Sequence, residues 1–207
     1  GYGEEDALVK AESSMLAKGL ERALSGIKAG QESRYAVSGV CLRLKKATIL
    51  HAVSTTGVQL TQANIPCESS SNAAAFFDAG NQKPALLPHK VAQLFYKICS
   101  AASGEAVIVG TQNQIYLKAG PVTVSGLLAQ QTFPNYDLMI KGIITNKECR
   151  INAEALKKAI GRTMTMVSEE TNGIAFTFSE KKVVLSSASQ DKGKSRVVLD
   201  CQLEGES

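Results

Sequence analysis

The sequence predicts an α+β fold of tandem βαβββ units (repeats one to three), with helices on one face and antiparallel sheets on the other. One short strand, one amphipathic helix and three further strands recur in the same order along the 207 residues. Within each repeat, the second element alone carries apolar residues at helical spacing. Hydrophobic residues make up 44% of the chain, which is enough for a globular core.

Repeat one begins with a strand at residues 7–12 and a helix at 13–30, followed by strands at 34–44, 47–55 and 57–65. Ser13 or Ser14 is expected to cap the start of the helix, and Gly30 is expected to end it. The predicted apolar face of this helix consists of Leu16, Leu20, Ala23, Leu24 and Ile27.

Repeat two follows a predicted loop at residues 67–83, which is longer than most connections and which Phe76 and Phe77 could hold down. It has a strand at 84–90, a helix at 91–104, and strands at 105–111, 114–120 and 122–130. The apolar face of its helix consists of Val91, Leu94, Phe95 and Ile98.

Repeat three has a strand at 147–152, a helix at 153–172 with Asn152 as its N-cap, and strands at 173–180, 181–189 and 195–203. The apolar face of its helix consists of Leu156, Ile160, Met164 and Val167. Since two repeats can share one core, residues 1–141 are predicted to form a complete domain. Residues 142–207 would form a linker and half a domain.

Basic residues occur on the solvent side of all three predicted helices. Evenly spaced Lys and Arg suit phosphate groups and read no base sequence. The alternative is that these are ordinary solvated helix faces, since a net charge of +4 permits nucleic-acid binding without requiring it. The candidate DNA-facing residues are Lys18, Arg22, Lys28, Lys90, Lys97, Lys157, Lys158 and Arg162.

No pattern in the chain indicates catalysis, a metal or a cofactor. The turn at Gly193 to Ser195 lacks the earlier glycine of a phosphate-binding loop, and neither His51 nor His89 has a nearby carboxylate or cysteine set. The five cysteines form no CxxC pair, which favours reduced thiols in a cytoplasmic protein. Neither a signal peptide nor a membrane-spanning run is visible.

The segment "QQTFPNYDLMI" at residues 130–140 is unusually apolar for a surface linker. Pro134 argues against a helix here. Phe133 and Tyr136 are expected to anchor the segment against a domain core. Leu138 and Met139 either face a groove that accepts a peptide or pack between domains.

The tandem repeats, the basic helix faces and the Phe-Pro-Asn-Tyr stretch at 133–136 resemble the bacterial sliding clamp, the β subunit of DNA polymerase III. Residues 132–140 resemble the family's link between its middle and C-terminal domains. Residues 88–98 and the strands after them resemble the second half of the middle domain, and 151–187 resemble the start of the C-terminal domain. The family closes two chains of three domains into a ring, so this chain resembles a middle domain and half of a C-terminal domain.

The resemblance implies a DNA-clamp fold and a non-enzymatic processivity factor of the replicative polymerase, without a cofactor, in the cytoplasm at the nucleoid. The implied partners are duplex DNA, contacted through phosphates, polymerase and clamp-loader peptides, and a second chain in a ring dimer of the full-length form. By position, the implied partner-peptide groove contains Val37, Thr55, Gly57, Val58, Gln59, Leu60, Pro134, Leu138 and Met139.

The turn at residues 56–60 departs from the family, which usually has Asp-Gly-His-Arg-Leu where this chain has Thr-Gly-Val-Gln-Leu. Loss of the His-Arg pair weakens the case for the usual partner peptide. It favours an alternative function, a clamp-like protein-binding scaffold that does not encircle DNA.

Overall fold

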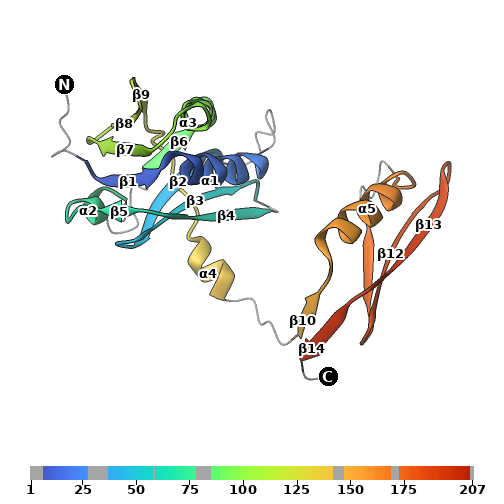
Figure 1. Ribbon diagram of the computed structural model, residues 1–207. Coiled ribbons are helices and arrows are strands. Elements are labelled where there is room, and N and C mark those ends of the chain that lie inside the picture. The colour runs from blue at the N-terminus through green and yellow to red at the C-terminus, as the bar shows by residue number, and fades with distance from the viewer. Residues whose placement is uncertain are drawn as a thin grey trace. The chain divides into compact units, whose positions relative to one another are not determined.

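The computed structural model describes residues 7–27, 37–57, 59–77, 85–141, 147–168 and 173–205. The chain divides into two compact parts, an N-terminal lobe (residues 1–135) and a C-terminal lobe (136–207) (Figure 1). The elements of the N-terminal lobe are β1 (Val9–Glu12), α1 (Ser13–Ser25), β2 (Val37–Lys46), β3 (Ile49–Thr55), β4 (Leu60–Pro66), β5 (Glu68–Ser69), α2 (Ala73–Phe77), β6 (Ala85–Pro88), α3 (His89–Ala101), β7 (Glu105–Gly110), β8 (Gln114–Ala119) and β9 (Val122–Leu127). Those of the C-terminal lobe are α4 (Tyr136–Lys141), β10 (Lys147–Arg150), α5 (Ala153–Met164), β11 (Ala175–Phe178), β12 (Lys182–Ser189), β13 (Gly193–Asp200) and β14 (Gln202–Gly205).

The first two repeats exchange their first strands. One sheet of the N-terminal lobe has the order β5-β1-β7-β8-β9, so that β1 of repeat one joins the strands of repeat two. The other sheet has the order β4-β3-β2-β6, so that β6 of repeat two joins the strands of repeat one. All of these pairs are antiparallel. Neither repeat can therefore complete its sheet without the other.

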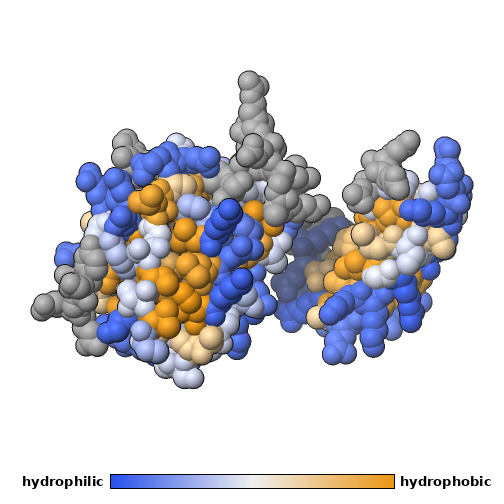
Figure 2. Space-filling model, turned by 90° about the horizontal axis from the view of Figure 1, so that it is seen from above, coloured by the Kyte–Doolittle hydropathy of each residue, from blue (hydrophilic) through white to orange (hydrophobic). Residues whose placement is uncertain are grey.

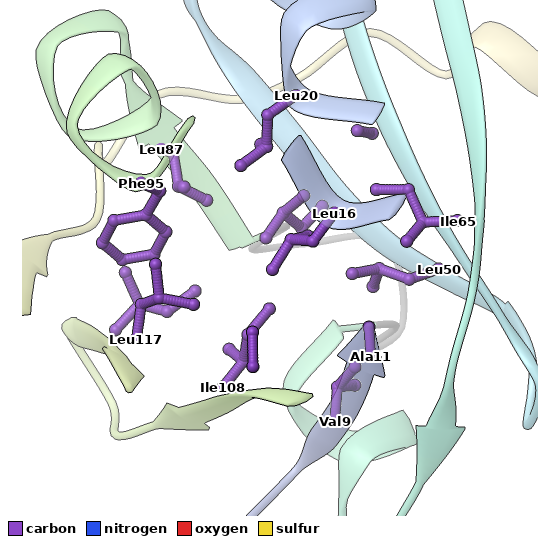
Figure 3. Close-up of a cluster of buried hydrophobic side chains, with 14 of the residues drawn as sticks. Val9, Ala11, Leu16, Leu20, Leu50, Ile65, Leu87, Phe95, Ile108 and Leu117 are labelled. Atoms are coloured by element: carbon purple, nitrogen blue, oxygen red, sulfur yellow. The ribbon is translucent and has the colours of Figure 1, made fainter. Parts of the chain in front are cut away.

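The core of the N-terminal lobe lies between these sheets and the helices α1 and α3, which pack against each other. Leu16 and Leu20 of α1, Phe95 of α3, and Ile65 and Leu117 of the sheets are fully buried and point toward one another (Figure 3). The predicted apolar face of α1 is therefore the face that the core covers. On α3 the prediction was only partly right, because Phe95 is buried but Leu94 is exposed.

The ends of α1 differ from those predicted. The N-cap is Glu12 rather than Ser13 or Ser14, because the Glu12 carboxylate accepts a hydrogen bond from the Met15 N–H at 3.1 Å. The helix ends at Ser25, not at residue 30. Near that end the Ser54 hydroxyl of β3 donates to the Ala23 carbonyl at 2.6 Å, so a strand supplies a partner for the last turn.

The predicted loop at 67–83 contains two short elements, β5 and α2. Strand β5 pairs with β1. A strand of only two residues has no recognisable pattern in the sequence. Phe77 is buried, and its ring meets that of Phe76 edge-on at a centroid distance of 4.8 Å. The two phenylalanines therefore belong to the lobe core or its margin, as the sequence suggested.

In the C-terminal lobe, α5 packs on β12 and β13 of the three-stranded sheet β11-β12-β13. Asn152 is the N-cap of α5, as predicted, and its Oδ1 accepts from the Ala155 N–H at 3.0 Å. The helix ends at Met164, although the sequence extended it to residue 172. The Ser187 hydroxyl of β12 donates to the Thr163 carbonyl at 2.7 Å, which repeats the contact between Ser54 and α1. The run predicted at 195–203 is two strands, β13 and β14, separated by Cys201.

Candidate nucleic-acid interface and peptide groove

The predicted DNA-facing residues that the structure describes are all exposed. Their helices bury the opposite face in the core, so amphipathic packing directs the basic side chains to solvent. These residues are Lys18 and Arg22 on α1, Lys90 and Lys97 on α3, and Lys157, Lys158 and Arg162 on α5. Lys28 lies outside the described residues.

Two of these positions are repeated between helices of different lobes. Lys18 and Arg22 are the sixth and tenth residues of α1, and Lys158 and Arg162 are the sixth and tenth residues of α5. Repeats one and three thus present the same pair of cations from the same turns.

Among the residues that the structure describes, none of these seven cations forms a salt bridge, whereas Lys10 pairs with Glu105 at 3.7 Å and Arg150 pairs with Glu148 at 3.0 Å. The pKa of the Glu12 carboxyl is lowered chiefly by its hydrogen bond from the Ser14 hydroxyl, and the charge of Lys18 is the smallest contribution. These seven exposed side chains can therefore contact an external anion.

The turn between β3 and β4 forms one side of the predicted groove. Gly57 has a φ of 89°, a conformation that favours glycine. The Thr55 hydroxyl accepts from the Gly57 N–H at 3.1 Å and donates to the Gln59 carbonyl at 2.8 Å. The Thr56 N–H also donates to that carbonyl at 3.1 Å. The turn is thus held by its own hydrogen bonds.

The exposure of the groove residues is mixed. Thr55 is buried, Leu60 and Pro134 are half-buried, and Gly57 and Gln59 are exposed. Val58 lies outside the described residues, as do the side chains of Val37, Leu138 and Met139. The groove therefore remains a prediction.

Phe133 and Tyr136 are buried, in agreement with an anchoring role for the Phe-Pro-Asn-Tyr stretch. The expectation that Pro134 excludes a helix was wrong, because α4 begins at Tyr136. Pro134 precedes the first turn of that helix, where its missing N–H breaks no helical hydrogen bond. Two cavities of the described residues lie elsewhere, beside β1 and beside β10.

The cysteines and histidines do not assemble into a reactive site in the described ranges. All five cysteines are free, and burial raises the pKa of the Cys41 thiol to about 12 and that of the Cys99 thiol to about 11. No three His, Cys, Asp or Glu side chains of these ranges come together as a metal site. No helix of the same ranges is both long and apolar enough to cross a bilayer.

Comparison with known proteins identified neither a matching family model nor a matching curated protein. Solved structures do match over the whole chain. The DNA polymerase III subunit beta from Pseudomonas aeruginosa has a TM-score of 0.81 at 20% identity, covering 100% of this chain and 54% of that chain. The corresponding protein from Thermotoga maritima has a TM-score of 0.79 at 20% identity, with 100% and 53% covered.

The beta sliding clamp from C. crescentus matches with a TM-score of 0.80 at 16% identity, covering 100% of this chain and 54% of that chain. The chain therefore spans about half the length of the sliding clamps that it matches. At these identities the likeness establishes the fold. It confirms the prediction of an α+β DNA-clamp fold, and the fold is that of the bacterial sliding clamps.

Proposed function

We propose that this chain is a DNA sliding clamp, or part of one: a non-enzymatic processivity factor that holds the replicative polymerase on duplex DNA. The observation that carries the proposal is the clamp fold along the whole chain. The exposed cations at matching positions of α1 and α5 support it, since a protein that slides needs weak phosphate contacts and no base contacts.

In this proposal, residues 1–141 correspond to a complete clamp domain and residues 142–207 to a linker and half of the next one. The full-length form is a ring of two chains in the cytoplasm, at the nucleoid, and the basic faces of α1, α3 and α5 turn toward the DNA. Polymerase and clamp-loader peptides dock in the groove at the β3–β4 turn and α4. No cofactor takes part.

We predict sequence-independent binding of duplex DNA. Fluorescence anisotropy with two labelled duplexes of unrelated sequence should give equal affinities at low salt. The logarithm of the affinity should fall linearly with the logarithm of salt concentration, with a slope of about 0.9 for each phosphate contacted.

Absence of binding at low salt would contradict the proposed phosphate contacts of this chain and favour the second candidate, a clamp-like scaffold that binds peptides only. The specific observation behind that candidate is the turn at 56–60, which lacks the family's His-Arg pair. A strong preference for one of the duplexes would contradict both candidates, because neither reads base edges.

The groove proposal predicts that an apolar peptide binds beside α4. Met139→Asp, and separately Leu138→Asp, should weaken binding of a labelled polymerase-tail peptide at least tenfold (about 1.4 kcal/mol), because each places a charge on an apolar surface. Calorimetry or anisotropy would measure this.

Ile140→Asp is the matched control, since Ile140 is a neighbour on the same short helix and is already exposed. It should leave the affinity unchanged. If all three variants bind the peptide as the parent does, the groove lies elsewhere, whatever the result with DNA.

A further inference from the structure

Helices α1 and α3 carry a single carboxylate among their cations. The two helices pack against each other, and their charged residues are Lys18, Glu21, Arg22, Lys90 and Lys97. All five side chains are exposed. Glu21 therefore offsets one of the four positive charges on this surface, which is called the α1–α3 face below.

The carboxylate is specific to α1. The ninth residue of the helix is Glu21 in α1, Lys97 in α3 and Gly161 in α5. Helix α5 shares with α1 a lysine at its sixth position and an arginine at its tenth, yet it has no carboxylate between them. A helix that presents this pair of cations does not require an acidic residue at the ninth position, so the role of Glu21 lies outside the repeat pattern.

Glu21 does not pair with the cations beside it. It lies three residues after Lys18 and directly before Arg22, and a spacing of three residues on a helix is close enough for an ion pair. Within the described part of the chain, however, neither cation forms a salt bridge with it. The Tyr96 hydroxyl of α3 donates to Oε1 of Glu21 at 3.5 Å. The carboxylate is therefore directed across to the neighbouring helix.

Tyr96 can hold the carboxylate in place because its ring is part of the packed lobe. Tyr96 is half-buried, and it packs against the hydrophobic core of the N-terminal lobe. Phe95, its neighbour on α3, is fully buried. A side chain packed against a dense core has little freedom to move. The Tyr96 hydroxyl thus fixes the negative charge of Glu21 between α1 and α3.

The solvent sides of these helices also carry apolar side chains. Met15 of α1 is 37% exposed and Leu94 of α3 is 42% exposed. On one face of the N-terminal lobe, hydrophilic residues lie on both sides of an apolar area (Figure 2). Charges beside apolar surface are screened less than charges surrounded by water. One fixed carboxylate is therefore sufficient to change the attraction between the α1–α3 face and an anion.

We propose that Glu21 limits the affinity of the α1–α3 face for the phosphate backbone of duplex DNA, and that Tyr96 is the positioning residue that holds the Glu21 carboxylate between the two helices. This role rests on the proposed function, because it concerns the same surface. The carboxylate repels phosphates that approach the cations on either side of it. Phosphate contacts are thereby weakened but not lost, as a protein that slides requires.

Glu21→Gln should tighten duplex binding, because the amide keeps the size of the side chain and can still accept the hydrogen bond from Tyr96, while the charge is removed. At low salt the dissociation constant should fall about two- to fivefold, which is the effect of one exposed charge in a high dielectric. The gain should shrink as the salt concentration rises, because ions screen exposed charges. Anisotropy with a labelled duplex would measure both effects.

Glu68→Gln is the matched control. Glu68 is exposed and belongs to the same lobe, but it lies on β5, outside both helices. The two substitutions change the net charge of the chain equally, so a general loss of repulsion from DNA would appear in both. The dissociation constant of the Glu68→Gln chain should stay close to that of the parent chain. An equal gain in the two variants would overturn the proposal.

Tyr96→Phe tests the positioning role. It keeps the ring in the core and removes only the hydroxyl, so that the Glu21 carboxylate is free to pair with Lys18 on its own helix. A lysine in an ion pair attracts phosphates less, and duplex binding should weaken about twofold at low salt. In a Glu21→Gln background, Tyr96→Phe should leave the affinity unchanged, because Tyr96 acts through the carboxylate. A loss of affinity in both backgrounds would show that Tyr96 has only a structural role.

The same measurements separate the role of Glu21 from the proposed function. If the parent chain binds duplex DNA and the Glu21→Gln chain binds it no more tightly, Glu21 does not limit affinity, although the clamp function stands. If the parent chain does not bind at low salt but the Glu21→Gln chain does, repulsion by Glu21 is supported and the proposed phosphate contacts of the parent are wrong. If neither chain binds, both proposals are overturned.

Discussion

Phe95→Ala is expected to lower the free energy of unfolding of the N-terminal lobe by about 3–5 kcal/mol. Phe95 is 0% exposed, and its ring is directed between Leu87 and Leu117 in the shared core (Figure 3). Truncation removes apolar contacts from α3 and from both sheets and leaves a cavity that the fully buried neighbours cannot easily fill. Because a domain is stabilised by only about 5–15 kcal/mol, most of the stability of the lobe would be lost.

Leu94→Ala is the matched control, because Leu94 precedes Phe95 on the same helix and is 42% exposed. It should change the stability by less than about 0.5 kcal/mol. Since the chain has no tryptophan, urea unfolding is best followed by circular dichroism. A Phe95→Ala effect below about 1 kcal/mol would mean that the side chain is not part of a packed core.

The C-terminal lobe should keep its own urea transition in the Phe95→Ala protein. Its core residues Ala159, Val183, Leu185 and Cys201 form a cluster separate from that of the N-terminal lobe. A parallel loss of both transitions would show that the lobes unfold as one cooperative body, and would contradict the division of the chain after residue 135.

The repeat pattern was predictable because apolar residues recur at helical spacing in each helix and because turn residues separate successive strands. Leu16 and Leu20 mark the core face of α1 in the sequence and are fully buried. The helix ends were not predictable to the same degree. The carbonyls of Ala23 and Thr163 near those ends accept hydroxyl groups of Ser54 and Ser187, which are distant in the sequence.

Local sequence patterns likewise could not predict the exchange of first strands between repeats one and two. Nothing in the composition of β1 indicates that it pairs with β7 rather than with a strand of its own repeat, because pairing depends on both sheets at once. The candidate DNA interface was easier, since basic residues opposite an apolar face are visible at helical spacing. The groove stays a prediction, because it was assigned by resemblance to residues from segments as distant as Thr55 and Pro134, and no local pattern links these segments.

Reversal of charge on the helices is expected to have the largest effect on DNA binding. Replacing Lys18, Arg22, Lys90, Lys97, Lys158 and Arg162 with glutamate should weaken duplex binding by at least about a hundredfold at low salt and flatten its salt dependence. Each cation that contacts a phosphate contributes counterion release, and each glutamate adds repulsion. The fold should survive, because all six side chains are exposed.

The control must separate a local surface from net charge. Six exposed lysines of strands and turns, Lys46, Lys118, Lys147, Lys182, Lys192 and Lys194, offer the same number of reversals away from α1, α3 and α5. A protein with these six replaced by glutamate has the same formal net charge as the helix variant, so long-range repulsion from DNA is matched. If phosphates contact the helix faces, the control should retain a salt slope near that of the parent protein. If both variants lose affinity equally, the attraction comes from overall charge, and the helix cations are ordinary solvated residues. If neither loses affinity, the chain binds DNA through another surface, and the proposed orientation of the helices toward the duplex is wrong.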